Sequence, residues 1–417
     1  MALWQRGPAG RAILIVFLLG TGPAVAPAAE PDPWVGKRVI TKYGTVLKVG
    51  KAVVDDADWG KNLARGKDQN VSRVYRVERT NGPWLWLVAE ESGARGWMQA
   101  AQVIPFDQAI DYITAEIRAN PGVATYYNDR GLVWSDRHEY DIAIADYNAA
   151  IRHESNEAIY FNNRGNAWYK KKEYDKAIAD YNEAIRLDPK YADAFHSRGY
   201  AWGDKKEYDK AIADYNEAIR LDPKFALAFI NRGIAWGAKK EYDKAIADDN
   251  EAIRLDPKGY LPFFNRGVIA LIQSHDGASA DAETGLEHHS WRGEYSLYLA
   301  LLGHFGHRQM HRDAEARKLL DRAAEKGDTA AWPFPVIRYL RGDLAEKALL
   351  DAATDDDKRT EARTYLGLDL SLKGKPEEAL PHLRWVQEHG NPAFVEYPIA
   401  VAELERIEGK VAETAQP

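Results

Sequence analysis

The most regular pattern of apolar and polar positions in this 417-residue chain lies between residues 124 and 257. From 174 to 185, apolar residues are spaced three and four apart and so share one stripe of a helix: Tyr174, Ala177, Ile178, Tyr181, Ala184 and Ile185. Phe161, Gly165 and Trp168 have the same spacing on the preceding segment. Pro189 ends the second helix. The pattern predicts pairs of helices that must stack, since one pair cannot bury its stripe alone.

This helix pair recurs every 34 residues, with small, aromatic and proline residues at fixed places. They are Gly131, Gly165, Gly199, Gly233 and Gly267; Trp134, Trp168, Trp202 and Trp236; Ala143, Ala177, Ala211 and Ala245; Ala150, Ala184, Ala218 and Ala252; and Pro189, Pro223 and Pro257. The period and these positions resemble the tetratricopeptide repeat. The resemblance implies a mainly α fold, a solenoid of helical hairpins with four regular repeats over 124–257. It also implies a concave groove that binds extended peptides or partner helices.

The repeats depart from the family at the position before each repeat glycine, where an apolar residue is usual. Here it is arginine: Arg130, Arg164, Arg198, Arg232 and Arg266. An aspartate follows sixteen residues after the first four: Asp146, Asp180, Asp214 and Asp248. We expect these charges to pair within or between repeats, because an unpaired buried charge is costly.

The period weakens on both sides of the regular repeats. Residues 107–121 resemble the second half of a repeat, and we expect a capping half-repeat that joins the solenoid to the preceding domain. Over 258–410 we expect degenerate repeats and a closing helix from Ala393 to Glu408. This tail is loosely similar to that of periplasmic lipoprotein-type tetratricopeptide proteins. Their lipid anchor does not carry over, since the chain has no cysteine.

Residues 34–105 have the pattern of a small β domain. Short runs at 38–41, 72–78 and 84–89 are separated by turn-forming residues, and Trp84 to Met98 is typical of a hairpin that turns at Glu91 to Ala94. Five short strands and a Gly-Trp pair near the end resemble a bacterial SH3-like barrel. The tryptophans fit either a ligand groove or, as we prefer, the core that so small a barrel needs.

Residues 1–28 are typical of a secretory signal peptide, with Arg6 and Arg11 before an apolar run and an Ala26-Pro27-Ala28 cleavage motif. We expect export to a bacterial periplasm or secretion, or anchoring if the leader stays uncleaved. The chain carries a net charge of −7, or −9 without the two leader arginines, which argues against nucleic acid as a partner. With no cysteine, the chain has no disulfide, thiolate zinc site or cysteine nucleophile.

The near-identical second, third and fourth repeats show where the copies differ. Residues 173–190 and 207–224 are identical, and 241–258 differs only by Asp249 in place of Tyr181 and Tyr215. The first helices differ along one face, which in the tetratricopeptide family lines the groove. The predicted groove residues are Asn162, Asn166, Tyr169, Asp193, His196, Tyr200, Leu227, Ile230, Ile234, Phe264 and Val268. They predict a ligand with a polar and an apolar end, although drift of exposed positions is the alternative. The family's carboxylate clamp lacks its lysines here.

Other candidate sites in the sequence have simpler explanations. His304, His307, His311 and Glu315 could align as metal ligands on one helix, but we expect Gly303 and Gly306 to break it and a turn near Gln309. The acid-rich 351–357 segment has the pattern of a helix start and lacks that of a calcium loop. The lysine pairs at 171–172, 205–206 and 239–240 form a ridge that we expect to be solvated and offset by Glu173, Glu207 and Glu241.

These patterns predict an exported scaffold that binds a peptide or partner protein in the solenoid groove. We expect no enzyme activity, cofactor or metal, since no phosphate loop, nucleophile elbow or zinc-protease motif occurs in the sequence. The alternative is a cell-envelope glycan-binding protein that uses its SH3-like barrel and whose repeats recruit a wall enzyme. Neither the partner nor the oligomeric state follows from the sequence.

Overall fold

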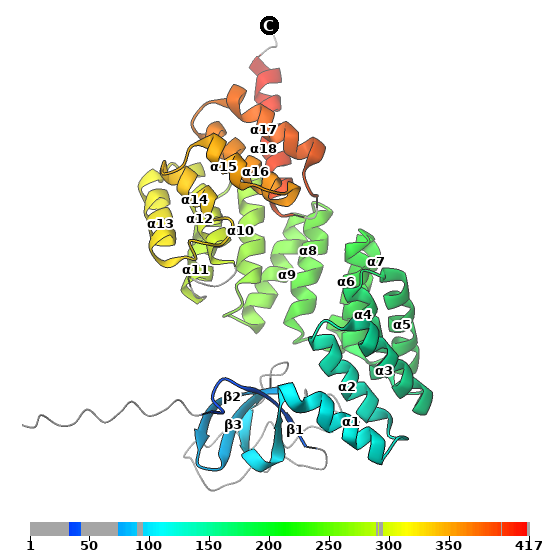
Figure 1. Cartoon of the computed structure of the whole chain (residues 1–417). Coiled ribbons are helices and arrows are strands. Elements are labelled where there is room, and N and C mark those ends of the chain that lie inside the picture. Colours follow the sequence, from blue (N-terminus) through cyan, green and yellow to red (C-terminus); the bar gives the residue numbers. More distant parts are fainter. Residues whose placement is uncertain are drawn as a thin grey trace, which may run out of the picture. The chain divides into compact units, whose positions relative to one another are not determined.

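The computed structural model describes residues 33–42, 74–89, 95–288, 291, 295–392 and 394–414 (Figure 1). The chain divides into two compact units, Met1–Pro121 and Gly122–Pro417, which are described separately. The predicted leader and the Glu91–Ala94 turn lie outside the described residues. None of the helices described is both long enough and apolar enough to cross a membrane.

The described part of the first unit contains a five-stranded antiparallel sheet. Its strands are β1 (Arg38–Thr41), β2 (Val74–Asn81), β3 (Trp84–Ala89), β4 (Arg95–Gln99) and β5 (Val103–Pro105), in the order β4-β3-β2-β1-β5. The predicted β3–β4 hairpin is present, with Leu85 opposite Met98 and Trp86 opposite Trp97. One face carries a core of Val39, Tyr75, Val77, Leu85, Leu87, Met98 and Val103. A small β domain is therefore confirmed, and its SH3-like identity stays a prediction.

Two short 3-10 turns, Ala100–Gln102 and Phe106–Gln108, flank β5 and lead into helix α1 (Ala109–Ala119). This helix buries Ala109, Ile113 and Ile117, which share one stripe. It belongs to the first unit and packs beside β5 and the second 3-10 turn. Its role as a cap for the repeats stays a prediction.

The second unit begins with four regular helical hairpins. They are α2 (Ala124–Asp136) with α3 (Tyr140–His153), α4 (Ala158–Lys170) with α5 (Tyr174–Leu187), α6 (Ala192–Asp204) with α7 (Tyr208–Leu221), and α8 (Ala226–Ala238) with α9 (Tyr242–Leu255). The repeat glycine lets the two helices of a hairpin approach closely. A Cβ atom on Gly165 would lie 2.7 Å from the ring of Tyr181, and one on Gly199 2.8 Å from that of Tyr215. The expected solenoid of hairpins is confirmed.

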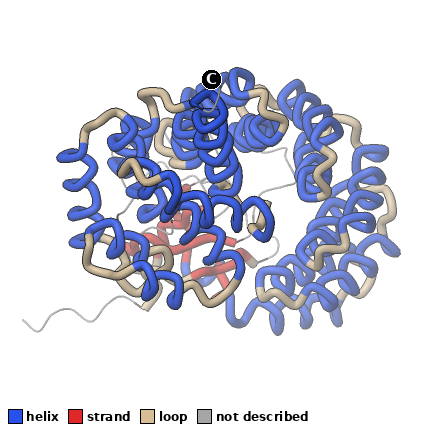
Figure 2. Tube along the Cα trace, turned by 90° about the horizontal axis from the view of Figure 1, so that it is seen from above, coloured by secondary structure: helices blue, strands red, loops and turns tan. Residues whose placement is uncertain are grey.

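The first helices lie on the inner side of this stack. Along the array, each first helix contacts the next first helix (α2 with α4, α4 with α6, α6 with α8), and these contacts are more extensive than those between successive second helices. Helices on the inside of a curved stack are the closer ones, and the regular hairpins follow a curved path when seen from above (Figure 2). The face on which the repeats differ is therefore carried by the inner helices.

The irregular repeats after residue 258 form α10 (Leu261–Gln273), α11 (Ala278–His288), α12 (Ser296–Gln309), α13 (Asp313–Lys326), α14 (Phe334–Arg341), α15 (Glu346–Ala352), α16 (Asp356–Leu372), α17 (Pro376–His389) and α18 (Glu396–Thr414). One large apolar core joins α10 to α16. The closing helix begins at Glu396, later than we expect from the sequence, and runs on to Thr414. Asp355 accepts a hydrogen bond from the backbone of Lys358 and so caps α16, which confirms the predicted helix start.

The prediction that Gly303 and Gly306 break their helix is wrong. Helix α12 runs through both glycines and ends at Gln309, where the turn was expected. A Cβ atom on Gly303 would lie 2.5 Å from the side chain of Leu319, and one on Gly306 would lie 2.7 Å from the backbone nitrogen of Ser279. Close packing of α12 against its neighbours, which the sequence pattern does not show, requires these glycines.

Candidate functional site

The repeat arginines form a ladder of ion pairs with buried aspartates, and this ladder positions the inner helices. Arg198 donates through Nε and Nη2 to both carboxylate oxygens of Asp214 in the same hairpin, at 2.8 and 2.6 Å. Its Nη1 donates to Asn182 of the preceding hairpin at 2.6 Å. The expected arginine–aspartate pairing is confirmed, within repeats, and it recurs as Arg130–Asp146, Arg164–Asp180, Arg232–Asp248 and Arg266–Asp281. Each pair also links neighbouring hairpins wherever the asparagine bond is present.

For the Arg198–Asp214 pair, burial affects the pKa of the aspartate more strongly than the ion pair does. Loss of hydration raises the pKa of Asp214, although the hydrogen bonds and charge of Arg198 oppose this shift. A pair of this kind stabilises the fold weakly compared with apolar contact, and its loss on one side is costly. The ladder therefore fixes how the hairpins stack, and the identity of the other side chains on the inner face can differ between repeats.

The inner face carries several apolar side chains in contact with solvent. Tyr200 is 43% exposed, and Leu227 and Ile234 are each 51% exposed. Leu132, at the place on α2 that Ile234 occupies on α8, is 37% exposed. Leu132 lies outside the three most similar repeats, and the 34-residue period places it in the same frame as Asn166, Tyr200 and Ile234.

The two asparagines of the predicted polar end differ in how far a ligand can reach them. Asn166 is exposed and accepts a hydrogen bond of 2.8 Å from the hydroxyl of Tyr181. Asn162 is only 4% exposed, and its Oδ1 has no hydrogen-bond partner among the described residues. Of these two asparagines, Asn166 is the one a ligand can reach without rearrangement.

His196 and Asp193 on α6 both have shifted pKa values, because neighbouring atoms remove part of their hydration. His196 lies 2.9 Å from Asn231 and its ring centroid lies 4.7 Å from that of Phe225, and burial lowers its pKa to about 4. Asp193 is exposed, and partial loss of hydration together with the nearby Asp222 raises its pKa. His196 is therefore neutral at physiological pH and supports the face by packing and hydrogen bonding.

Three predicted groove residues lie inside the protein. Ile230, Phe264 and Val268 are each 7% exposed, and the last two belong to the core of the irregular repeats. Helix α18 packs on α10, where Arg406 donates to the backbone carbonyl of Ile272 at 3.2 Å. From the sequence, an apolar residue at a variable position can belong either to a groove or to the core. Tertiary packing puts these three in the core. The exposed apolar end of the face therefore ends at α8.

Tyr169, at the end of α4, lies in a cluster of aromatic and acidic side chains. Its ring centroid lies 5.3 Å from that of Tyr200 and 5.5 Å from that of Tyr174. Its hydroxyl donates to the carboxylate of Asp204. Two of the predicted groove residues thus meet across the boundary of the second and third repeats.

Asp249 is fully buried where the preceding repeats have a tyrosine. Its Oδ1 lies 3.4 Å from Asn265, and its Oδ2 has no hydrogen-bond partner among the described residues. Burial raises the pKa of Asp249 to about 8. In the two repeats before it, Tyr181 packs with Ala201 and Tyr215 with Ala235, whereas the matching place in the next repeat is Ile269. A larger aliphatic residue thus accompanies the smaller aspartate.

The histidines of α12 serve the packing of the irregular repeats. Nδ1 of His304 lies 3.1 Å from the carbonyl of Ala316, and Nε2 of His307 lies 3.0 Å from Glu283. His311 has a φ of 57° in the turn after the helix. In the part of the chain that the structure describes, no three histidine, aspartate or glutamate side chains come together as a metal site.

In the lysine ridge the second lysine of each pair is exposed, as we expect, but the first has a partner different from the expected glutamate. Lys171, Lys205 and Lys239 pair with Asp141, Asp175 and Asp209 of the preceding hairpin. The glutamate at each helix start pairs instead with the lysine three residues later, as in Lys176–Glu173 at 2.8 Å. These lysines therefore take part in the contacts between repeats.

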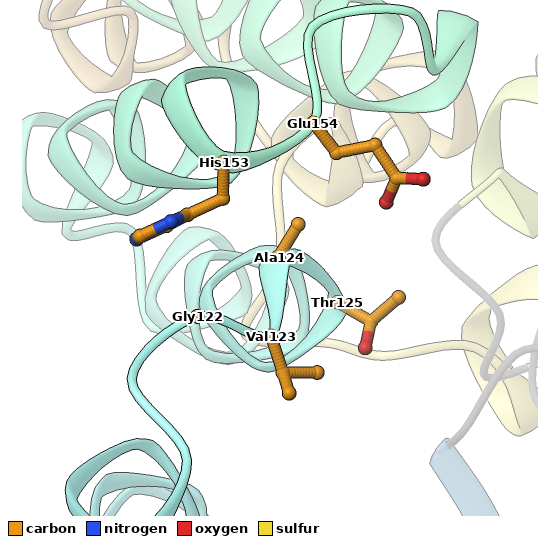
Figure 3. Close-up of a pocket in the computed structure, with 6 residues that line it drawn as sticks. All are labelled: Gly122, Val123, Ala124, Thr125, His153 and Glu154. Carbon is orange, nitrogen blue, oxygen red and sulfur yellow. The ribbon is translucent and has the colours of Figure 1, made fainter.

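A shallow depression of about 340 Å³ lies at the start of the array, beside the first turn of α2 and the end of α3. It is lined by Gly122, Val123, Ala124, Thr125, His153 and Glu154 (Figure 3). His153 and Glu154 point away from each other in this view, and the His153 ring stacks on Tyr127 at 5.2 Å. The depression contains none of the predicted groove residues and no catalytic pair.

Trp86 and Trp97 of the β domain lie on the face opposite its core, whereas Trp34 packs against the core. Trp86 and Trp97 meet edge-on with ring centroids 5.3 Å apart, and the guanidinium of Arg79 lies 4.6 Å from the Trp86 ring. Our preference for a tryptophan core is therefore wrong for Trp86, because alternation along β3 puts Leu85 and Leu87 in the core. Glycan binding by this domain stays a prediction.

Comparisons with known proteins agree with the repeat pattern. A family model of the TPR repeat matches residues 165–203, and one of the tetratricopeptide repeat matches residues 192–225. No curated protein matches the chain.

Several solved structures are similar in part. A crystal structure of MamA is 27% identical, with 37% of this chain and 90% of that chain covered and a TM-score of 0.34. YrrB, described as a TPR protein with an unusual peptide-binding site, is 21% identical, with 46% and 97% covered and a TM-score of 0.37. A tetratricopeptide repeat protein from Parabacteroides merdae is 20% identical, with 57% and 91% covered and a TM-score of 0.42. The hairpins and the two family matches together show that this chain carries tetratricopeptide repeats, arranged as a helical solenoid.

Proposed function

We propose that this protein is a non-catalytic interaction scaffold that binds a segment of a partner protein on the inner face of its regular repeats. The observation that carries the proposal is the exposure of apolar side chains. Among the described residues, seven large apolar side chains are exposed, and Leu132, Tyr200, Leu227 and Ile234 occupy equivalent or neighbouring places on α2, α6 and α8. Apolar side chains gathered on one face of a water-exposed protein are typical of an interaction site.

The internal comparison of repeats supports the same face. Stacking requires the same contacts in every copy, and residues 173–190 and 207–224 are identical accordingly. The inner positions carry different side chains in each copy although the backbone arrangement is the same. A surface that must fit one ligand along its length needs such differences, whereas a purely structural array does not.

A photo-crosslinking amino acid at Ile234 tests the proposal. The control carries the same amino acid at Ala213, which is exposed on the second helix α7. We expect one discrete partner to be captured from position 234 in cells, and capture to be lost when Leu227→Asp is added. Equal capture from both positions, or capture that Leu227→Asp leaves unchanged, would contradict a binding face on the inner helices.

We also propose that residues 1–28 direct export to the cell envelope. The support is the arrangement of charge, apolar run and small residues in the sequence. Amino-terminal sequencing of the protein purified from its native cells should give a start close to residue 29. A start at Met1 would leave an anchored or cytoplasmic protein and would contradict cleavage.

A further inference from the structure

Three positions at which the repeats differ converge on one spot of the inner face. Tyr169 comes from α4, and Tyr200 and Asp204 come from α6. The Tyr169 hydroxyl donates to the Asp204 carboxylate, and the ring of Tyr174 at the start of α5 lies 5.5 Å from that of Tyr169. Burial and this carboxylate raise the pKa of Tyr169, so that the phenol stays a neutral donor. Three aromatic rings and one carboxylate therefore lie together at the boundary of the second and third repeats.

Stacking of the repeats does not need this cluster. At the next boundary the matching residues are Gly203, Ile234 and Ala238, and the hairpins pack there through the same kinds of side chains. The next boundary keeps Tyr208 at the place of Tyr174, but it stacks without a counterpart of the Tyr169–Tyr200 ring pair or of the Asp204 carboxylate. Tyr200 is 43% exposed and Asp204 is exposed, so a ligand can reach both.

Aromatic faces beside a carboxylate have the chemistry that attracts an organic cation. The face of a phenol ring carries negative charge density and attracts an ammonium or guanidinium group. A guanidinium group is planar, stacks on aromatic rings and donates two parallel hydrogen bonds to a carboxylate, which a lysine ammonium cannot do. We propose that Tyr169, Tyr174, Tyr200 and Asp204 form a subsite for an arginine side chain of the partner segment. This inference rests on the proposed function of the inner face.

The surface next to the subsite indicates the spacing of the ligand's side chains. No heavy atom lies within 4 Å of a Cβ atom built on Gly237, and the nearest to one on Gly203 is the Tyr215 hydroxyl at 4.0 Å. A ligand backbone can therefore approach the helices closely here. Neighbouring packed helices lie about 10 Å apart, which is about three residues of extended chain. The ligand should carry an aliphatic residue for Leu227 and Ile234 about three residues from its arginine.

Selection of displayed random twelve-residue peptides on the purified full chain tests this inference. We expect enrichment of arginine three residues from leucine, isoleucine or valine. For the best peptide, replacement of its arginine by the neutral isostere citrulline should weaken binding about tenfold, and replacement by lysine about threefold. On Asp204→Asn, the arginine and citrulline peptides should bind within about threefold of each other. The exposed carboxylate variant Asp243→Asn should keep the full tenfold difference.

The outcomes separate the subsite from the scaffold. Suppose that the selected peptides bind the natural protein, fail to bind Ile234→Arg and yet show no preference for arginine. This result would overturn the subsite and leave the proposed function standing. A failure to enrich any peptide would overturn both. If Asp204→Asn lowers the melting temperature but leaves the preference for arginine unchanged, the cluster only joins two repeats and the inference is wrong.

Discussion

The buried Asp249 should make the stability of the repeat array depend on pH. Its ordinary pKa of 3.8 is raised to about 8 in the folded protein, chiefly by burial. Below pH of about 4 both folded and unfolded chains hold the proton, and burial of the neutral acid is tolerated. As the pH rises toward 8, the unfolded chain releases the proton and the folded chain retains it. The free energy of unfolding then falls by about 1.4 kcal/mol per pH unit, which levels off above pH of about 8.

The total effect follows from the size of the shift. A difference of about four pKa units corresponds to at most about 6 kcal/mol, a large fraction of the stability of most domains. Asp249→Asn keeps the shape of the side chain and removes its charge. We therefore expect the variant to match the natural protein near pH 4 and to become progressively more stable than it up to pH 8.

Urea unfolding followed by tryptophan fluorescence at pH 5, 6, 7 and 8 measures this difference. Asp243→Asn, an exposed carboxylate on the same helix, is the matched control and should show no such trend. The reasoning would be refuted if the stability gained by Asp249→Asn were the same at every pH. A further variant, Asp249→Tyr with Ile269→Ala, restores the tyrosine–alanine pair of the preceding repeats and should also remove the pH dependence.

Three further predictions concern the contacts that hold the repeats together. Gly199→Ala should destabilise the protein by about 1–3 kcal/mol, since its Cβ would lie 2.8 Å from the tyrosine ring of α7. A Cβ atom on Gly237 would meet no atom within 4 Å, so Gly237→Ala should be neutral or stabilising by up to about 1 kcal/mol. Equal effects of Gly199→Ala and Gly237→Ala in thermal unfolding would contradict the packing argument. Asp214→Ala should cost about 3–5 kcal/mol because it leaves Arg198 without its carboxylate, and a loss below about 1 kcal/mol would show that the pair is unimportant. Lys206→Gly should stabilise by about 0.5–1 kcal/mol, since Lys206 has a φ of 61°, and destabilisation in the same assay would argue against relief of backbone strain.

The sequence alone determined the repeating part of this protein. A fixed 34-residue period, apolar residues at helical spacing and the recurring arginine and aspartate predict the hairpins, their packing at glycine and the paired charges, because every copy must satisfy the same local contacts. The same repetition identifies the inner face, since most of the differences between the three most similar copies lie on their first helices. For this reason Tyr200, Leu227 and Ile234 could be identified before their exposure was known.

Only the tertiary structure decided what lies outside this repetition. Phe264 and Val268 have the same character as Leu227, yet packing in the irregular repeats buries them. Gly303 and Gly306 have the sequence pattern of helix breakers, but in the structure they allow neighbouring helices to pack closely against α12. The cluster around Asp204 joins residues up to 35 positions apart, and no local pattern indicates that they meet. Contacts between distant, non-equivalent segments depend on how helices pack, which a local pattern of apolar and polar residues does not encode.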